Sequence, residues 1–231
     1  MRNQLLTLAL LSVVSAACNA QSGQQQQPAQ QGENDPTRRA AGGSVPAGWA
    51  IRLDDKDQGR YTANDISFMA MGGGFHITSG PAAIYPGADL PNGDFVLEAT
   101  FNQNEAPSHP EAYGLFFGGR DLDKSDQQTY VYFLVRGNGQ YLINHRAGRD
   151  VHKIVDWTSS PAIKSQDAGG KATNQLTIRA GADSVRFIAN GQQLAAISRQ
   201  EITNTGGKAG LRVNHNLNVL VTGFRAAAGA K

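Results

Sequence analysis

Short strand-like segments separated by turn signals fill most of the chain. In "DFVLEATF", residues 94–101, large apolar residues alternate with Val, Glu and Thr, which is the period-two pattern of a half-buried β-strand. Other segments are rich in aromatic and β-branched residues and are bounded by Gly, Asp and Ser. They occupy residues 49–55, 75–78, 82–85, 113–119, 129–137, 140–143, 151–155, 174–180, 183–197, 209–215 and 218–224.

Turn chemistry joins these segments into hairpins. Asn138-Gly139 and Asn190-Gly191 each lie between two strand-like segments, which is the commonest short hairpin signal. Turn signals recur about every 8–12 residues without a long helical period, as in sandwiches and barrels. Segments 130–135 and 218–224 are apolar on both faces, so we expect them to be central strands. The pattern predicts an all-β fold, a two-sheet antiparallel β-sandwich of the jelly-roll kind.

The first 44 residues have a different character. An apolar run from Leu5 to Val14, followed by small residues, predicts a secretory signal over residues 1–18. It resembles a bacterial lipoprotein signal, in which Cys18 would carry the lipid, although Ser15 replaces the usual Leu. The alternative is ordinary cleavage after Ala20. Residues 19–44, rich in Gln, Gly and Pro, predict a disordered tether, and residues 45–228 the jelly-roll domain.

Cysteine use and charge narrow the classes of function. Cys18 is the only cysteine, so no disulfide forms within the chain and the fold depends on its hydrophobic core. The chain has 21 basic and 19 acidic residues, and residues 45–231 keep 18 and 17 of them. This near-neutral balance argues against a nucleic-acid partner. We expect an exported protein, at the outer membrane or periplasmic face as a lipoprotein, or otherwise periplasmic or secreted, that meets the membrane only through its lipid anchor.

A family resemblance supports the predicted fold. "EAYGLFFGGRDL", "YVYFLVRGNGQYLI", "SVRFIANGQ" and "GLRVNHNLNVLVTGF" resemble the laminin-G-like, concanavalin A-like jelly rolls of bacterial exported proteins. Within that superfamily the chain is similar to the group called domain of unknown function 1080, or 3-keto-disaccharide hydrolase-like. The resemblance covers about Trp49 to Arg225. The superfamily includes lectins, glycosidases and adhesive modules, so the fold alone selects no activity.

No residue pattern for catalysis stands out. Glycoside hydrolysis needs two facing carboxyl groups, and the alternating acids of jelly-roll glucanases are absent, because Glu98 is the one acid inside a clear strand. The five histidines are dispersed, without H-E-x-x-H or C-x-x-C. We therefore predict no catalytic residues and no required cofactor. The acids Asp121, Asp123 and Asp126 are a candidate calcium site, and the alternative is a solvated loop.

Polar residues at strand positions form the candidate binding site. We expect a carbohydrate or similar small ligand on the concave face, with affinity from stacking and hydrogen bonds. The candidate residues are Arg136, Asn144, Arg146, His152 and Trp157, while "RVNHN" supplies further polar side chains nearby. The alternative is an ordinary solvated sheet face. A sugar hydrolase of the 3-keto-disaccharide hydrolase-like type and a structural or protein-interaction domain remain the alternative functions.

Overall fold

The structure, a computed structural model, describes residues 44–54 and 58–229. The predicted signal, its Cys18 and residues 19–43 of the predicted tether lie outside the described residues. Within the described ranges, no helix is long and apolar enough to cross a membrane.

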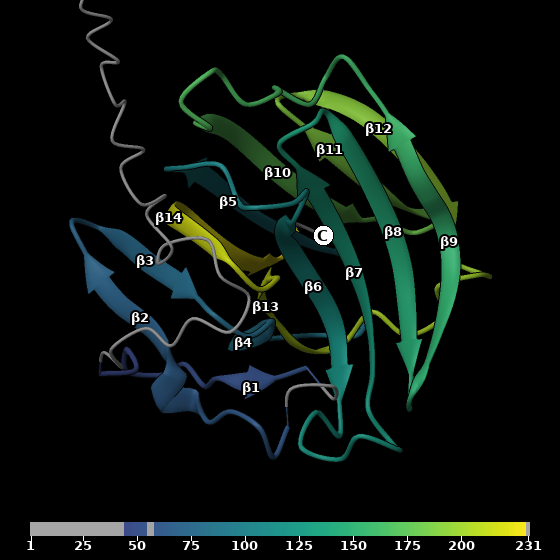
Figure 1. The fold of residues 1–231 in the computed structure, drawn as a ribbon. Coiled ribbons are helices and arrows are strands. Elements are labelled where there is room, and N and C mark those ends of the chain that lie inside the picture. The colour runs from purple at the N-terminus through teal and green to yellow at the C-terminus, as the bar shows by residue number, and fades with distance from the viewer. Residues whose placement is uncertain (1–43, 55–57, 230–231) are drawn as a thin grey trace, which may run out of the picture. The chain divides into compact units, whose positions relative to one another are not determined.

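Two antiparallel sheets of seven strands each make up the described part of the chain (Figure 1). In spatial order the first sheet consists of β1 (Arg52–Leu53), β4 (Ala83–Leu90), β13 (Gly207–Val213), β6 (Ala112–Arg120), β7 (Thr129–Arg136), β8 (Gln140–Ala147) and β9 (Asp150–Ser159). The second sheet consists of β12 (Gln192–Ser198), β11 (Ser184–Ala189), β10 (Ala172–Ala180), β5 (Phe95–Gln103), β14 (Leu217–Ala228), β3 (Gly74–Ser79) and β2 (Ile66–Met71). A 3-10 turn, η2 (Ala63–Asp65), precedes β2.

The main core lies between the two sheets. β5 alternates buried and half-buried residues along its whole length, as its sequence predicts. Phe101 of β5 stacks on Tyr113 of β6 with ring centroids 5.2 Å apart, and Phe133 of β7 meets Phe187 of β11 edge-on at 5.6 Å. These contacts join opposite sheets, so interdigitated aromatic side chains hold the sandwich together.

Both Asn-Gly hairpins are confirmed, with different turns. Asn190 and Gly191 have φ values of 50° and 81°, the left-handed pair of a two-residue turn, and Ala189 pairs with Gln192 across it. In the other hairpin Arg136 pairs with Gln140 across a three-residue loop, in which Gly139 alone is left-handed, at φ 81°. The Asn-Gly pair located both turns but did not distinguish the loop lengths.

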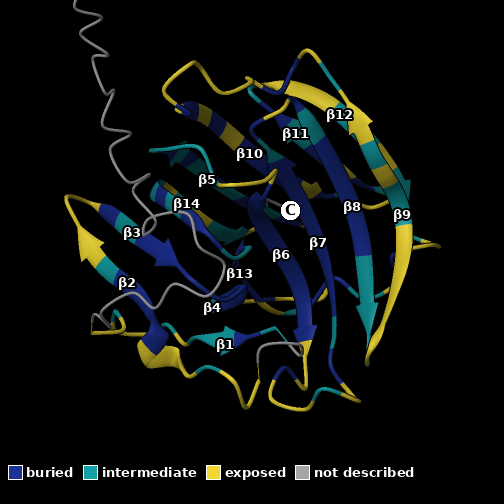
Figure 2. Cartoon of the chain, viewed as in Figure 1, coloured by how far each residue is buried: buried dark blue, intermediate teal, exposed yellow. Residues whose placement is uncertain are grey.

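The predicted all-β, two-sheet antiparallel sandwich is confirmed, and so is the central position of two strands. β7 lies between β6 and β8, and β14 lies between β5 and β3. Figure 2 shows β6 and β7 buried along almost their whole length, whereas β9 is largely exposed. Because β7 is buried on both faces, something other than the opposite sheet must cover its outward side chains.

Candidate functional site

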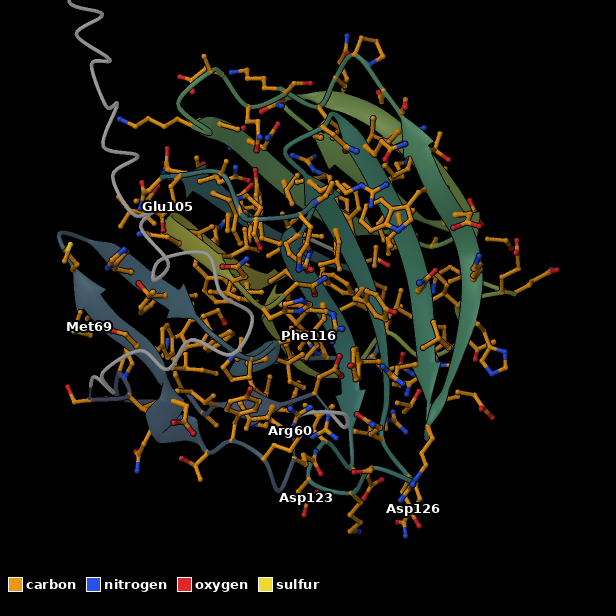
Figure 3. All side chains as sticks on the ribbon, viewed as in Figure 1. Arg60, Met69, Glu105, Phe116, Asp123 and Asp126 are labelled. Carbon is orange, nitrogen blue, oxygen red and sulfur yellow. The ribbon has the colours of Figure 1, made fainter. Side chains whose placement is uncertain are left out.

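The outward side chains of the first sheet form a second hydrophobic cluster. Along β7, Val131, Phe133 and Val135 point into the main core, and the residues between them point outward. We call this second cluster the outer cluster. Its buried members are Ile84, Ala112, Phe116, Leu122, Tyr130, Tyr132, Leu134 and Leu142, with Trp157 packed against them. Figure 3 labels Phe116 over β6. The apolar pattern on both faces of β6 and β7 thus serves two clusters.

A buried arginine ties polar groups to the outer cluster. Arg212 of β13, only 6% exposed, donates hydrogen bonds to Tyr130 Oη at 3.1 Å and Asp54 Oδ2 at 3.0 Å. Its guanidinium lies 4.8 Å from the ring centroid of Tyr132. Burial acts to lower the pKa of Arg212, but attraction to Tyr130 and Asp54 outweighs it, so the pKa is raised. The guanidinium therefore stays charged within an aromatic surface.

Two of the predicted site residues join this network. Arg146 of β8 lies 3.6 Å from Asp54 Oδ1, so Asp54 is bracketed by two guanidinium groups. Asn144 is buried, and its amide donates to Tyr132 Oη at 3.2 Å. Among the described residues, Asn144 Oδ1 and the Nε atoms of Arg146 and Arg212 are buried without a hydrogen-bond partner. Such groups call for an ordered water or a ligand.

Two further predicted residues form an accessible aromatic platform at the end of β7. The Arg136 guanidinium lies 3.9 Å from the ring centroid of Trp157 on β9, a close cation–π contact. Arg136 also donates to Gln140 Oε1. Burial lowers the pKa of Arg136, while the charge of Glu111 acts in the opposite direction. Both Arg136 and Trp157 are half-buried, so a ligand could reach them directly.

His152 lies on the other face of the first sheet, and the expectation that all five residues share one patch is wrong for it. His152 is paired across β8 and β9 with His145, which is itself opposite the core residue Val131. The reason is the strand period: residues 144 and 146 face outward, so position 145 and its partner face the other way. Whether His152 contacts a ligand stays a prediction.

The histidine pair lines a cavity of about 460 Å³ between the first sheet and the segment 201–204. The His145 and His152 rings are stacked at 5.9 Å, and His145 Nε2 lies 2.8 Å from Thr129 Oγ1. Burial lowers the pKa of His145, and the charge of His152 lowers it further. Lys153, Glu201 and Tyr130 are the other ionisable residues of the lining. This cavity therefore holds an imidazole favoured in its neutral form, able to accept a proton.

The aspartate loop between β6 and β7 does not gather its carboxylates. Asp121, Asp123 and Asp126 are all exposed, and Figure 3 shows the last two at the tip of this loop. Asp121 pairs with Lys124 at 3.1 Å. Within the described ranges the one group of metal-type ligands that converges is a different one, His109, Glu111 and His215. Calcium binding by the loop stays a prediction.

Sequence reasoning missed several groups of these sites. Asp54 follows a two-residue strand and carries no pattern of its own. Tyr130 and Tyr132 look like core residues in the alternation of β7, and only the sheet order shows that they face outward. For the His109 cluster, the H-x-E spacing of His109 and Glu111 was the one local signal.

Comparisons with known proteins identify the fold. No protein-family model matches the chain, and no curated protein matches it. The carbohydrate-binding module CBM66 from Bacillus subtilis is similar in structure, with a TM-score of 0.55, 12% identity, and coverage of 78% of this chain and 96% of that one. A Bacillus subtilis protein of unknown function with a galectin-like fold has a TM-score of 0.53 and 14% identity, covering 84% and 94%.

A third similar structure is the GH16 protein of the Bacteroides ovatus mixed-linkage glucan PUL, solved in complex with a product. Its TM-score is 0.54 at 8% identity, covering 78% of this chain and 94% of that one. The chain therefore has the concanavalin A-like jelly-roll fold that its sequence predicts. At these identities the likeness shows the fold alone. Membership of the domain of unknown function 1080 group stays a prediction.

Proposed function

We propose that this chain is a non-catalytic jelly-roll domain that binds carbohydrate on the outer face of its first sheet. In this proposal the protein is exported and held at a membrane through a lipid on Cys18. The observation that carries the binding proposal is the outer cluster itself, an outward-facing layer of aromatic rings and arginines that ends in the accessible pair Arg136 and Trp157.

The chemistry of this face suits a sugar. An indole ring offers an apolar face for the C–H groups of a pyranose, and a guanidinium beside it donates hydrogen bonds to hydroxyl groups. Trp157 and Arg136 are the accessible members at one end of β7, and Arg146 lies at the other end, where β8 pairs it with Tyr130. The buried Arg212 and Asn144 are positioning residues, because they hold Tyr130 and Tyr132 rather than reach solvent.

The charge of the face favours an acidic saccharide. Arg146 and Arg212 share the carboxylate of Asp54, while the guanidinium of Arg136 lies over Trp157. The central strands β13, β6, β7 and β8 contain no Asp or Glu at all. Guanidinium groups bind carboxylates and sulfates through paired hydrogen bonds. We therefore expect uronate-containing or sulfated glycans to bind more tightly than neutral ones.

The fold is consistent with this proposal. One similar structure is described as a carbohydrate-binding module and another is a GH16 protein with bound product. The analogy is at the level of fold and assigns no residue. The absence of acids from the central strands favours binding over hydrolysis, because a glycosidase needs two facing carboxyl groups.

A glycan array of neutral and acidic oligosaccharides tests the proposal, followed by calorimetry on the best ligand. Trp157→Ala and Arg146→Ala should each weaken binding about tenfold or more, as central aromatic and arginine contacts do. Arg225→Ala is the matched control, because this arginine is exposed on the second sheet and pairs with Glu98. Failure of the wild-type protein to bind any glycan would reject the proposal. Equal losses of glycan affinity in all three variants would show that the ligand does not bind at Trp157 and Arg146.

The second candidate function is a sugar hydrolase, and the cavity of His145 supports it. A neutral imidazole in a cavity that Glu201 and Lys153 also line supplies acid–base groups. Here His145 would act as general base. Hydrolysis of chromogenic glycosides or 3-keto-glycosides by the wild type, abolished in His145→Gln, would support this function. A lack of turnover across such a panel would contradict it.

A further inference from the structure

The ladder between β13 and β6 brings two distant segments together at one end of the sandwich. Val213 pairs with Tyr113, and the Asn214 amide donates to the Ala112 carbonyl at 2.9 Å. One further step in this register places His215 opposite Glu111. The chain leading into β6 supplies the third residue, His109, two positions before Glu111.

The three side chains converge on one carboxylate oxygen. His109 Nδ1 lies 2.9 Å from Glu111 Oε1, and His215 Nε2 lies 3.0 Å from the same atom. The two imidazole centroids are 5.1 Å apart, and all three ligand atoms lie within 4.8 Å of one another. Glu111 is buried, His215 is half-buried and His109 is exposed, so the cluster opens to solvent on one side.

We propose that His109, Glu111 and His215 form a binding site for a divalent transition-metal ion of the zinc type. Two imidazoles and one carboxylate are a ligand set that zinc takes. Tetrahedral bonds of about 2.0–2.2 Å would set the ligand atoms about 3.3–3.6 Å apart. The separations of 2.9 Å and 3.0 Å are shorter than this by about 0.3–0.7 Å, so metal binding requires small rotations of the side chains. Calcium is disfavoured, because it prefers oxygen ligands.

The site leaves a coordination position open. His109 and Glu111 line a small hollow of about 160 Å³, bounded on its far side by Asn138 and Gln166. A water molecule occupies about 30 Å³ of liquid, so the hollow accommodates a metal-bound water or a ligand hydroxyl. Three protein ligands with an open fourth position are the arrangement of exchangeable zinc sites rather than of closed structural ones.

The two residues that flank His215 in the sequence carry buried oxygen atoms without hydrogen-bond partners in the described structure. Asn214 Oδ1 and Asn216 Oδ1, on either side of His215, are buried and have no hydrogen-bond partner in the part of the chain that the structure describes. Buried oxygens of this kind call for an ordered water or a ligand. The frame around them is fixed, because Asn216 Nδ2 donates to Ser108 Oγ at 2.6 Å and so ties the β13–β14 turn to the segment of His109.

Metal titration of the purified, chelator-treated protein tests the site. We expect calorimetry with zinc chloride to show one tight site, and cobalt(II) to give the visible d–d absorption of a tetrahedral complex. His109→Gln should weaken zinc binding by about 100-fold or more, since even residues behind a ligand contribute 10–100-fold. Its side chain is 46% exposed, so this variant should fold normally. Glu111→Gln should have a similar effect, with circular dichroism as the check on folding.

The second histidine pair supplies the matched control. His152→Gln removes an imidazole stacked on His145, at the cavity of His145 and away from the cluster, and should leave zinc affinity unchanged. If the wild type binds no zinc at micromolar concentrations, Glu111 is a hydrogen-bond acceptor for two imidazoles and the proposal is overturned. Loss of zinc binding in His152→Gln but not in His109→Gln would also overturn it, by placing the metal at the other pair.

Discussion

Neutralising Asp54 should destabilise the domain strongly, because two arginines depend on this carboxylate. The side chains of Arg212, Arg146 and Asp54 are 7%, 11% and 12% exposed, with nitrogen–oxygen separations of 3.0 Å and 3.6 Å to Asp54. At an effective dielectric constant of about 20, unit charges about 4 Å apart attract by about 4 kcal/mol. Asp54→Asn removes this attraction and leaves two largely buried guanidinium groups without their counter-charge.

The expected loss in unfolding free energy is about 3 kcal/mol. Breaking a buried ion pair by removing one partner costs about 3–5 kcal/mol, and the amide oxygen of Asn keeps one weaker hydrogen bond. Urea denaturation followed by tryptophan fluorescence measures this loss by linear extrapolation. Adding Arg212→Met should recover part of it, because the uncompensated charge is then removed as well.

Glu98→Gln is the matched control for the charge change itself. Glu98 pairs with Arg225 at 3.3 Å, but the Arg225 side chain is 62% exposed. An exposed pair of this kind contributes about 0–1 kcal/mol, so this variant should unfold almost like the wild type. A loss below about 1 kcal/mol in Asp54→Asn would refute the reasoning, because removal of a buried partner then costs no more than removal of an exposed one.

Three further outcomes are expected. Gly210→Ala should unfold the domain or lower its melting temperature sharply, because a Cβ there would lie 2.0 Å from the Tyr85 carbonyl oxygen. Phe187→Ala should cost about 3–5 kcal/mol in urea denaturation, since its ring is fully buried. The pKa of His145 is lower in the folded protein than in the unfolded chain, so below about pH 6.5 the unfolded chain binds more protons than the folded protein. Acidification from pH 7 should therefore lower the free energy of unfolding, as urea denaturation at several pH values would show. His145→Gln should reduce this pH dependence, with His152, Lys153 and Glu201 as the facing ionisable groups.

The sequence predicted the architecture because strand alternation and turn chemistry are local. The pattern of β5 and the two Asn-Gly turns are each contained within about 20 residues, and the structure confirms them. β2, with the sequence "ISFMAM", escaped prediction, because it reads as a mixed segment until β3 pairs with it. Local patterns therefore located most strands, although none of them gave the order in which the strands pair.

The candidate sites depend on that order. The alternation within residues 141–146 predicts that Asn144 and Arg146 share one face, and β8 pairs them with Tyr132 and Tyr130 of the outer cluster. His152 was misplaced, because it pairs with His145, which faces the opposite side of the sheet from Asn144 and Arg146. Asp54, Arg212 and the trio around Glu111 join segments more than 100 residues apart, and only the paired sheets bring them together.

The position of the last two strands affects how the chain must fold. β13 lies between β4 and β6, and β14 lies between β5 and β3, so the final segment of the described chain completes the middle of both sheets. Neither sheet can be completed before residues 207–228 have been synthesised. Most contacts in the domain also join residues that are far apart in the sequence. Chains with such a topology fold slowly, and their strand edges stay unpaired until the long-range strand pairs form. During synthesis the domain should therefore remain unfolded until its C-terminal strands emerge.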